Sequence, residues 1–180
     1  MKFSKKALIL GVAVALLLSF GIFKDSSAQS SLTDEQLKRI SNNCLSIKST
    51  LNQLRTSDAL LRVNRGQLYE SIGAKLMNNF NSRVSSNNRD AKGLTLITGN
   101  YQTALTAFRD DYRAYALQLS AAIKINCDTQ PTQLHAAIID ARQKRAKVHT
   151  DVIRLNQFID DYRSGVSDFL INFERTAGND

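Results

Sequence analysis

Residues 134–173 read LHAAIIDARQKRAKVHTDVIRLNQFIDDYRSGVSDFLINF, with an apolar side chain at almost every third or fourth position. The apolar residues in phase are Leu134, Ile138, Ala141, Val148, Val152, Leu155, Ile159, Tyr162, Val166, Phe169 and Phe173. Arg145 is the one polar residue in the same phase. Such spacing puts these side chains on one face of a long α-helix, as in bundles and coiled coils. The sequence therefore predicts a helix of about 131–174, with Pro131 in its first turn.

Two further apolar stripes precede this segment. The first comprises Leu37, Ile40, Cys44, Ile47, Leu51, Leu54, Leu61, Leu68 and Ile72, with Asp58 and Arg65 in phase, and it loosens near Leu76 and Phe80. The second comprises Ile97, Tyr101, Leu105, Phe108, Tyr112, Tyr115, Leu119 and Ala122. They predict helices of about 33–84 and 94–126, separated by polar turns. Whether residues 33–84 form one helix or divide in two near Thr56–Asp58 stays open.

Composition agrees with a helical fold. Of the 180 residues, 43% are hydrophobic, which is enough for a folded core. One Pro and eight Gly argue against a turn-rich sandwich or barrel. Because two short turns join three long helices, we expect an all-α chain folded as an up–down–up antiparallel three-helix bundle in residues 29–180.

The N-terminus has the pattern of an export signal. Three lysines within residues 1–6 precede 17 uncharged residues, Ala7–Phe23, and the small residues Ser26, Ser27 and Ala28 follow. This order predicts a signal peptide, residues 1–28, that is cleaved after Ala28. An uncleaved anchor is the alternative, because 17 residues is the lower limit for a membrane span. Both place the remainder outside the cytoplasm, either secreted or anchored facing outward.

Removing residues 1–28 leaves 20 basic and 15 acidic residues, a net charge of +5. This mildly basic balance is compatible with attraction to anionic envelope polymers or lipid head groups. A nucleic-acid partner is not expected. Membrane contact is expected only through residues 7–23, if they remain uncleaved.

The two cysteines provide a test of the helix register. If the first hairpin turns at residues 85–86, the numbers of opposed residues add to about 171, as those of Cys44 and Cys127 do. Exported proteins of this size commonly bridge their cysteines. We therefore predict a Cys44–Cys127 disulfide, with two buried free thiols as the alternative.

The same register predicts a polar layer at mid-bundle. Asp58 and Arg145 occupy positions where apolar residues were expected, and Arg113 falls opposite both. A shared layer of Asp58, Arg113 and Arg145 would avoid the cost of an unpaired buried charge. Its role would be to fix the helix register or, as the alternative, to form a binding or proton-sensitive site.

The sequence contains little catalytic chemistry. His135 and His149 lie too far apart on one helix to share a metal. No glycine-rich phosphate loop or nucleophile motif is present in the sequence. The basic segment Ala141–His149 spreads its charges around the helix, which favours a solvated surface. We therefore predict no catalytic, cofactor-binding or metal-binding residues and no cofactor, and a protein that is not an enzyme.

A resemblance to a family adds to this interpretation. Ser57–Val84 (SDALLRVNRGQLYESIGAKLMNNFNSRV), together with Cys44, Cys127 and Ile159-Asp160-Asp161-Tyr162, resembles exported helical proteins of Saccharibacteria. These are host-dependent bacteria of the candidate phyla radiation. The resemblance covers most of the chain after residue 28 and implies an envelope or host-contact setting. It supplies no catalytic residues.

The leading hypothesis is thus a non-enzymatic structural or protein-interaction module at the cell envelope. An envelope or host-surface protein is the expected partner. Thr33–Asn43 would extend beyond the end of the bundle and contact this partner. The alternative is a module that holds a lipid or other apolar ligand between its helices. This alternative is suggested by the loosened stripe at Leu76–Phe80 and by Gly66 and Gly73. The oligomeric state stays open.

Overall fold

The computed structural model describes residues 32–177, and the predicted export segment of residues 1–28 lies outside this range. Within the described range every regular element is a helix, which confirms the predicted all-α class. No helix among these residues has both the length and the apolar content needed to cross a membrane.

The segment predicted as a helix of about 33–84 is interrupted in the structure near its start. Helix α2 spans Asp34–Asn42 and begins with a capping box, in which the backbone N–H of Thr33 donates to Gln36 Oε1 (2.9 Å) and that of Gln36 donates to Thr33 Oγ1 (3.3 Å). Asn43 ends α2, and its side-chain amide donates to the Arg39 carbonyl (2.8 Å). At Asn43 the backbone leaves the helical conformation, with φ −104° and ψ 17°. The interruption therefore falls at Asn43 and not at Thr56–Asp58, which lie inside the next helix.

Helix α3 spans Cys44–Ser71 and continues through the π-helical segment η1, Ile72–Met77, into helix α4, Asn78–Ser86. A π-helical turn contains an extra residue and so shifts which side chains face the core. The shift explains why the apolar phase loosens near Leu76 and Phe80. Gly73 allows close packing here, because a Cβ atom would lie 3.1 Å from Tyr101 Cε1 and 2.5 Å from Gln102 Nε2.

The two later helices have bounds close to those expected. Helix α5 spans Lys92–Lys124 and helix α6 spans Pro131–Ala177, and they form the most extensive helix contact in the described chain. Their buried small residues include Ala104, Ala122 and Ala141. Small side chains let helix axes approach closely. Between α3 and α5, by contrast, the bulky buried side chain of Tyr69 packs edge-on against Phe108, with ring centroids 5.7 Å apart.

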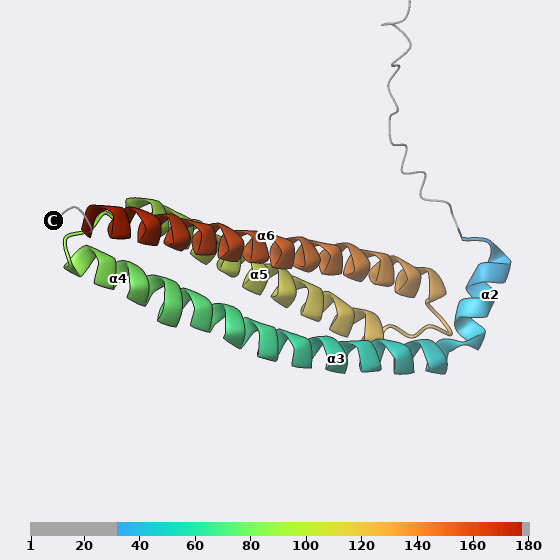
Figure 1. Ribbon diagram of the computed structural model, residues 1–180. Helices are drawn as coiled ribbons and strands as arrows, with labels where there is room; N and C mark the ends of the chain where they lie inside the picture. The colour runs from blue at the N-terminus through green and yellow to red at the C-terminus, as the bar shows by residue number, and fades with distance from the viewer. Residues whose placement is uncertain (1–31, 178–180) are drawn as a thin grey trace, which may run out of the picture. The chain divides into compact units, whose positions relative to one another are not determined.

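Figure 1 shows the continuous α3–η1–α4 segment beside α5 and α6. Hydrogen bonds join Tyr115 of α5 to Asp58 (2.7 Å), Tyr101 to the Tyr69 carbonyl (2.7 Å) and Asn81 to Thr98 (2.8 Å). Residue numbers therefore rise along α3–η1–α4 while those of their partners in α5 fall.

The interior consists of two apolar clusters. One lies near the cysteines and comprises Cys44, Leu51, Tyr115, Leu119, Ala122, Cys127, Leu134 and Ala141. The other comprises Tyr69, Met77, Leu94, Tyr101, Ala104, Leu105, Phe108, Leu155 and Tyr162. Tyr162 donates to Asn81 Oδ1 (2.8 Å), and burial raises the pKa of Tyr162 to about 12. The buried amide of Asn81 thus has partners on both α5 and α6.

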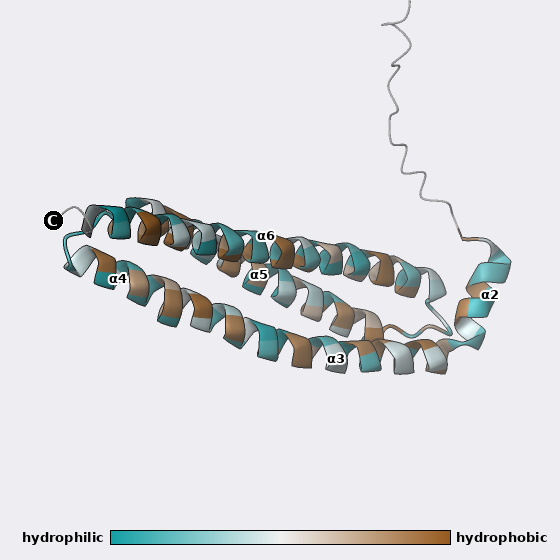
Figure 2. Ribbon diagram, in the orientation of Figure 1, coloured by the Kyte–Doolittle hydropathy of each residue, from teal (hydrophilic) through white to brown (hydrophobic). Residues whose placement is uncertain are grey.

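The expected α3 stripe is only partly correct. Leu61 and Leu68 are 51% and 56% exposed, whereas Tyr69 is 3% exposed and occupies the core. From Asp58 to Tyr69 is eleven residues, or three turns at 3.67 residues each, so a straight helix drifts away from the strict seven-residue repeat. Figure 2 shows hydrophobic residues, in brown, alternating with hydrophilic residues along α3 and α4.

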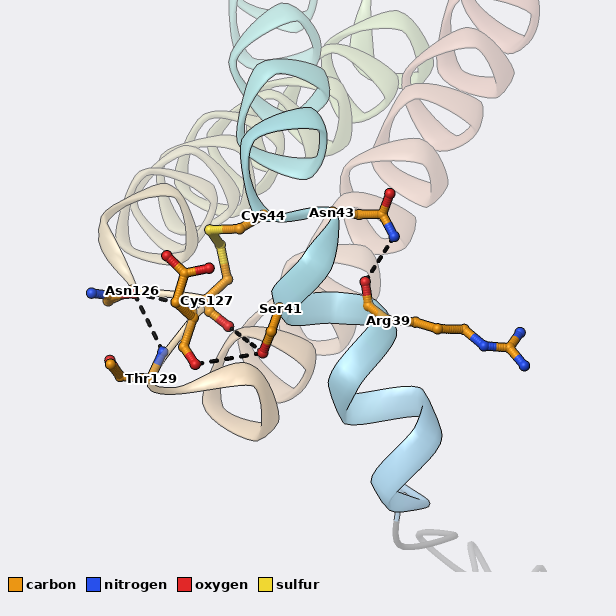
Figure 3. Close-up of a disulfide and its surroundings, with 8 residues drawn as sticks. Arg39, Ser41, Asn43, Cys44, Asn126, Cys127 and Thr129 are labelled. Carbon is orange, nitrogen blue, oxygen red and sulfur yellow. Dashed lines mark hydrogen bonds between the residues drawn. A yellow bond between two sulfur atoms is a disulfide. The ribbon is translucent and has the colours of Figure 1, made fainter.

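Cys44 and Cys127 form a disulfide, as predicted, with their Cα atoms 5.5 Å apart (Figure 3). The Ser41 hydroxyl of α2 donates to the Cys127 carbonyl (3.2 Å) beside it. Helix α2 contacts both α3 and α6. The predicted overhang, Thr33–Asn43, is thus a separate helix held to this end of the molecule.

Candidate functional site

A groove of about 610 Å³ opens at the middle of the molecule, between α3, α5 and α6. Its lining residues are Asp58, Leu61, Arg62, Arg65, Phe108, Tyr112, Tyr115, Arg142, Arg145, Ala146, Val148, His149 and Val152. We call it the arginine groove, because four arginines line it against a single carboxylate.

Asp58 is the one carboxylate that lines the arginine groove. Arg145 of α6 donates from Nε to Asp58 Oδ2 (2.9 Å) and from Nη2 to Oδ1 (3.2 Å). Tyr115 of α5 also donates to Oδ2 (2.7 Å). The side chain of Asp58 is 10% exposed and that of Arg145 is 53% exposed. The pair therefore joins α3 to α6 from a buried carboxylate to a partly solvated cation.

The partners of Asp58 control its ionisation. Burial alone would raise the pKa of this carboxyl, but the hydrogen bonds from Arg145 and Tyr115 and the charge of Arg145 together hold it below its ordinary value. Burial and the bond to Asp58 raise the pKa of Tyr115, so its hydroxyl keeps its proton and remains a donor. The hydrogen bond to Asp58 raises the pKa of Arg145. The cluster is thus ionised and satisfied at neutral pH.

The prediction that Arg113 belongs to the polar layer is wrong. Arg113 is exposed and pairs with Asp110 on its own helix (3.4 Å), while Tyr115 occupies the position beside Asp58 and Arg145. A register calculation fixes the height of a residue along a helix but not the side to which it points. Arg113 follows the apolar-face residue Tyr112 by one position, a rotation of about 100°.

The other arginines line the walls of the groove. Arg62 and Arg65 come from α3, and Arg62 lies over the Tyr112 ring, 5.5 Å from its centroid. Arg142 comes from α6 with Arg145, whereas their neighbour Lys144 pairs with Asp140 (3.0 Å). The basic segment 141–149 was predicted to be solvated, and Arg142, Arg145 and Lys147 are exposed, while the first two also line this groove.

Sequence reasoning did not identify Arg62 and Arg65 as members of the groove. The signal was their spacing, because residues 58, 61, 62 and 65 share one helical face at intervals of three and four. Arg142, Arg145 and His149 repeat the same intervals on α6. The floor between them is apolar and aromatic. Phe108 is 3% exposed, and Val148 and Val152 are half-buried.

The histidines do not come together. His149 lines the arginine groove, and His135 lines a different groove near the cysteine end. Within the described residues, no group of three or more His, Cys, Asp or Glu side chains is placed to hold a metal ion.

The opening suggested by the loosened stripe is filled. Met77, at the end of η1, is 1% exposed, and Phe80 packs edge-on against Phe169 of α6 with ring centroids 5.9 Å apart. The groove lined by α3, α5 and α6 is thus the arginine groove, and Leu76 and Phe80 are not among its lining residues.

Apolar side chains gather where α6 ends. Phe169 stacks on Phe173 with centroids 6.3 Å apart, and Leu170, Ile171 and Phe173 are 47%, 53% and 40% exposed. Arg89 lies over the Phe173 ring, 5.1 Å from its centroid. We call Phe169, Leu170, Ile171 and Phe173 the aromatic end. Figure 1 shows the end of α6 close to α4, at the opposite end of this part of the chain from α2.

Asp151 is a buried carboxylate that lines neither the arginine groove nor the pocket beside the aromatic end. Asp151 of α6 is 7% exposed, and its Oδ2 atom has no hydrogen-bond partner among the described residues. Burial, then the nearby carboxyl of Asp111, raise the pKa of Asp151 against the opposing charges of Arg154 and Lys147. Asp151 is therefore a source of strain in the folded state at neutral pH.

Comparisons with known proteins gave no match: no family model fits the chain, and no curated protein or solved structure is similar to it.

Proposed function

We propose that this chain is an exported, non-enzymatic interaction module of the cell envelope, folded as an up–down–up antiparallel three-helix bundle behind a signal peptide or anchor. The order of the hydrogen bonds supports the bundle, because partners in α5 fall in number as those in α3 and α4 rise. Residues in α6 rise again, from Arg145 at Asp58 to Tyr162 at Asn81.

An extracytoplasmic setting has two independent lines of support. Disulfides persist in oxidising compartments and are rare in the cytosol, and Cys44 and Cys127 form one. Residues 1–28 carry the basic, apolar and small-residue order of an export signal. We also propose that the helices pack in a coiled-coil-like manner and that the protein is located at the cell envelope.

The aromatic end carries the interaction proposal. Three large apolar side chains within four residues, Leu170, Ile171 and Phe173, keep 40% to 53% of their surface exposed. Protein interfaces are enriched in aromatic side chains at their centre and polar groups at their rim. Arg89 and Asp168 supply polar groups beside Phe169 and Phe173. We therefore assign this surface to a protein partner at the envelope or host surface.

A photocrosslinking side chain at position 173 tests the assignment in the cells that make the protein, because Phe173 is 40% exposed and lies against Phe169 and Arg89. The expected result is one discrete adduct with a single envelope or host-surface protein, identified by mass spectrometry. The matched control is position 117, because Leu117 on α5 is 67% exposed but lies outside the aromatic end. Equal, diffuse labelling from both positions would contradict the proposal.

A further inference from the structure

We propose that the arginine groove binds a single-chain amphiphile with an anionic head group, a carboxylate or a phosphate. The arginines would hold the head group, and the apolar floor would hold the chain. This inference goes beyond the proposed interaction module and concerns a surface separate from the aromatic end.

The first argument is the charge of the arginine groove. Its one carboxylate, Asp58, is already occupied by Arg145 and Tyr115. Within residues 32–177, Arg62, Arg65 and Arg142 form no ion pair, and the guanidinium of Arg62 lies over the Tyr112 ring. Three guanidinium groups on two facing walls are therefore available to an anion. Guanidinium groups bind carboxylates and phosphates through paired hydrogen bonds.

The second argument is the apolar floor between those walls. Phe108 and Tyr112 of α5 and Val148 and Val152 of α6 lie below the arginines. A small inorganic anion would leave this apolar surface uncovered, and an uncharged chain would leave the arginines without a counter-charge. An amphiphile would cover the apolar floor with its chain and supply the arginines with a counter-charge from its head group.

The third argument is size. Pockets for small organic ligands commonly measure about 300–1,000 Å³. The arginine groove, at about 610 Å³, is within that range. Its lining residues Leu61, Arg65 and Arg142 are exposed, so the groove is open to solvent and a chain can enter without unfolding of the helices. These dimensions favour one acyl or alkyl chain over a docked protein helix, which would cover a much longer face.

Calorimetric titration of the exported, disulfide-bonded protein tests the proposal with four probes below their micelle concentrations. They are sodium laurate, monododecyl phosphate, dodecyl maltoside and dodecyltrimethylammonium. We expect one molecule of laurate or dodecyl phosphate to bind, and the uncharged and cationic probes to bind at least about tenfold more weakly. Inorganic phosphate alone should not bind measurably. Equal binding of dodecyl maltoside, or of inorganic phosphate, would overturn the proposal.

Variants locate the binding site. Arg62→Gln with Arg65→Gln should weaken laurate binding at least about tenfold, because two charge-assisted contacts are lost. Lys75→Gln with Arg83→Gln removes the same charge from exposed sites outside the groove and should leave affinity unchanged. Ala146→Trp should abolish binding by filling the groove with no change in charge. Equal losses in both double variants would show general charge attraction and overturn the site.

Discussion

Arg145 Nε of α6 lies 2.9 Å from Asp58 Oδ2 of α3, although the two residues are 87 positions apart in the sequence. A charged pair, with Tyr115 as third partner, thus lies between the two apolar clusters of the core. The pair connects α3 to α6 at the level of the arginine groove, which both helices line. Its removal tests both the stability and the specificity of the fold.

Replacing Asp58 with Leu should lower the free energy of unfolding by about 2 kcal/mol, because Tyr115 and Arg145 lose their shared acceptor. The cost is less than for a fully buried pair, since the side chain of Arg145 is 53% exposed. Urea denaturation followed by circular dichroism measures it, and sedimentation reports the oligomeric state. Asp110→Leu, which removes an exposed partner, is the control and should change stability little. An equally stable and uniquely folded Asp58→Leu protein would rule out a register-fixing role.

Acid should destabilise the protein partly through Asp58. Its pKa is lowered in the folded state, so its contribution is complete above the ordinary value of 3.8 and is lost as pH falls through the folded pKa. Between about pH 5 and pH 2, Asp58→Asn should therefore lose less stability than the parent protein. Thermal unfolding across this range provides the comparison. Parallel pH curves would show that Asp58 is not linked to folding.

Asp151→Asn should raise the free energy of unfolding at neutral pH by about 1 kcal/mol. The raised pKa of Asp151 means that the folded state favours its protonated form, so the ionised carboxylate costs stability above the folded pKa. The gain should disappear as pH falls to the ordinary value of 3.8 or below. Asp161→Asn, at an exposed site on the same helix, serves as the control. A neutral-pH loss of stability in Asp151→Asn would contradict the assignment.

Gly66 and Gly73 form a matched pair. Gly66→Ala should stabilise the protein by about 0.5–1 kcal/mol, because nothing lies within 4 Å of the added Cβ and Ala favours a helix. Gly73→Ala should destabilise it by about 1 kcal/mol, since the new Cβ would press on Tyr101 and Gln102. The denaturant concentrations at which each variant and the parent protein are half unfolded measure both effects. Equal effects would show that α5 does not pack closely against η1.

The long-range pairings were predictable where two independent patterns agreed. Hairpin register and export chemistry both pointed to Cys44–Cys127, and polar residues in apolar phase pointed to Asp58 and Arg145. Both predictions depend on position along the length of the paired helices, which residue numbering preserves over many turns.

What sequence reasoning missed depends on rotation around a helix. The drift between Asp58 and Tyr69 turned Leu61 and Leu68 out of the core. The π-helical turn after Ser71 shifted the phase again, and α2 ended at Asn43, where the backbone leaves the helical conformation. A strict seven-residue repeat contains none of these local events. It had Asp58, Arg65 and Arg145 of the arginine groove in phase, but it did not include Arg62 or Arg142.

The most direct test of the account is the intact, non-reduced mass of the protein recovered from cells that make it, with membrane-bound and released fractions measured separately. The account predicts a chain that begins at Gln29, or a full-length chain in the membrane fraction, and in either case a mass two hydrogens below that of the dithiol. A cytoplasmic chain with Cys44 and Cys127 as free thiols would contradict both the export and the disulfide-closed bundle.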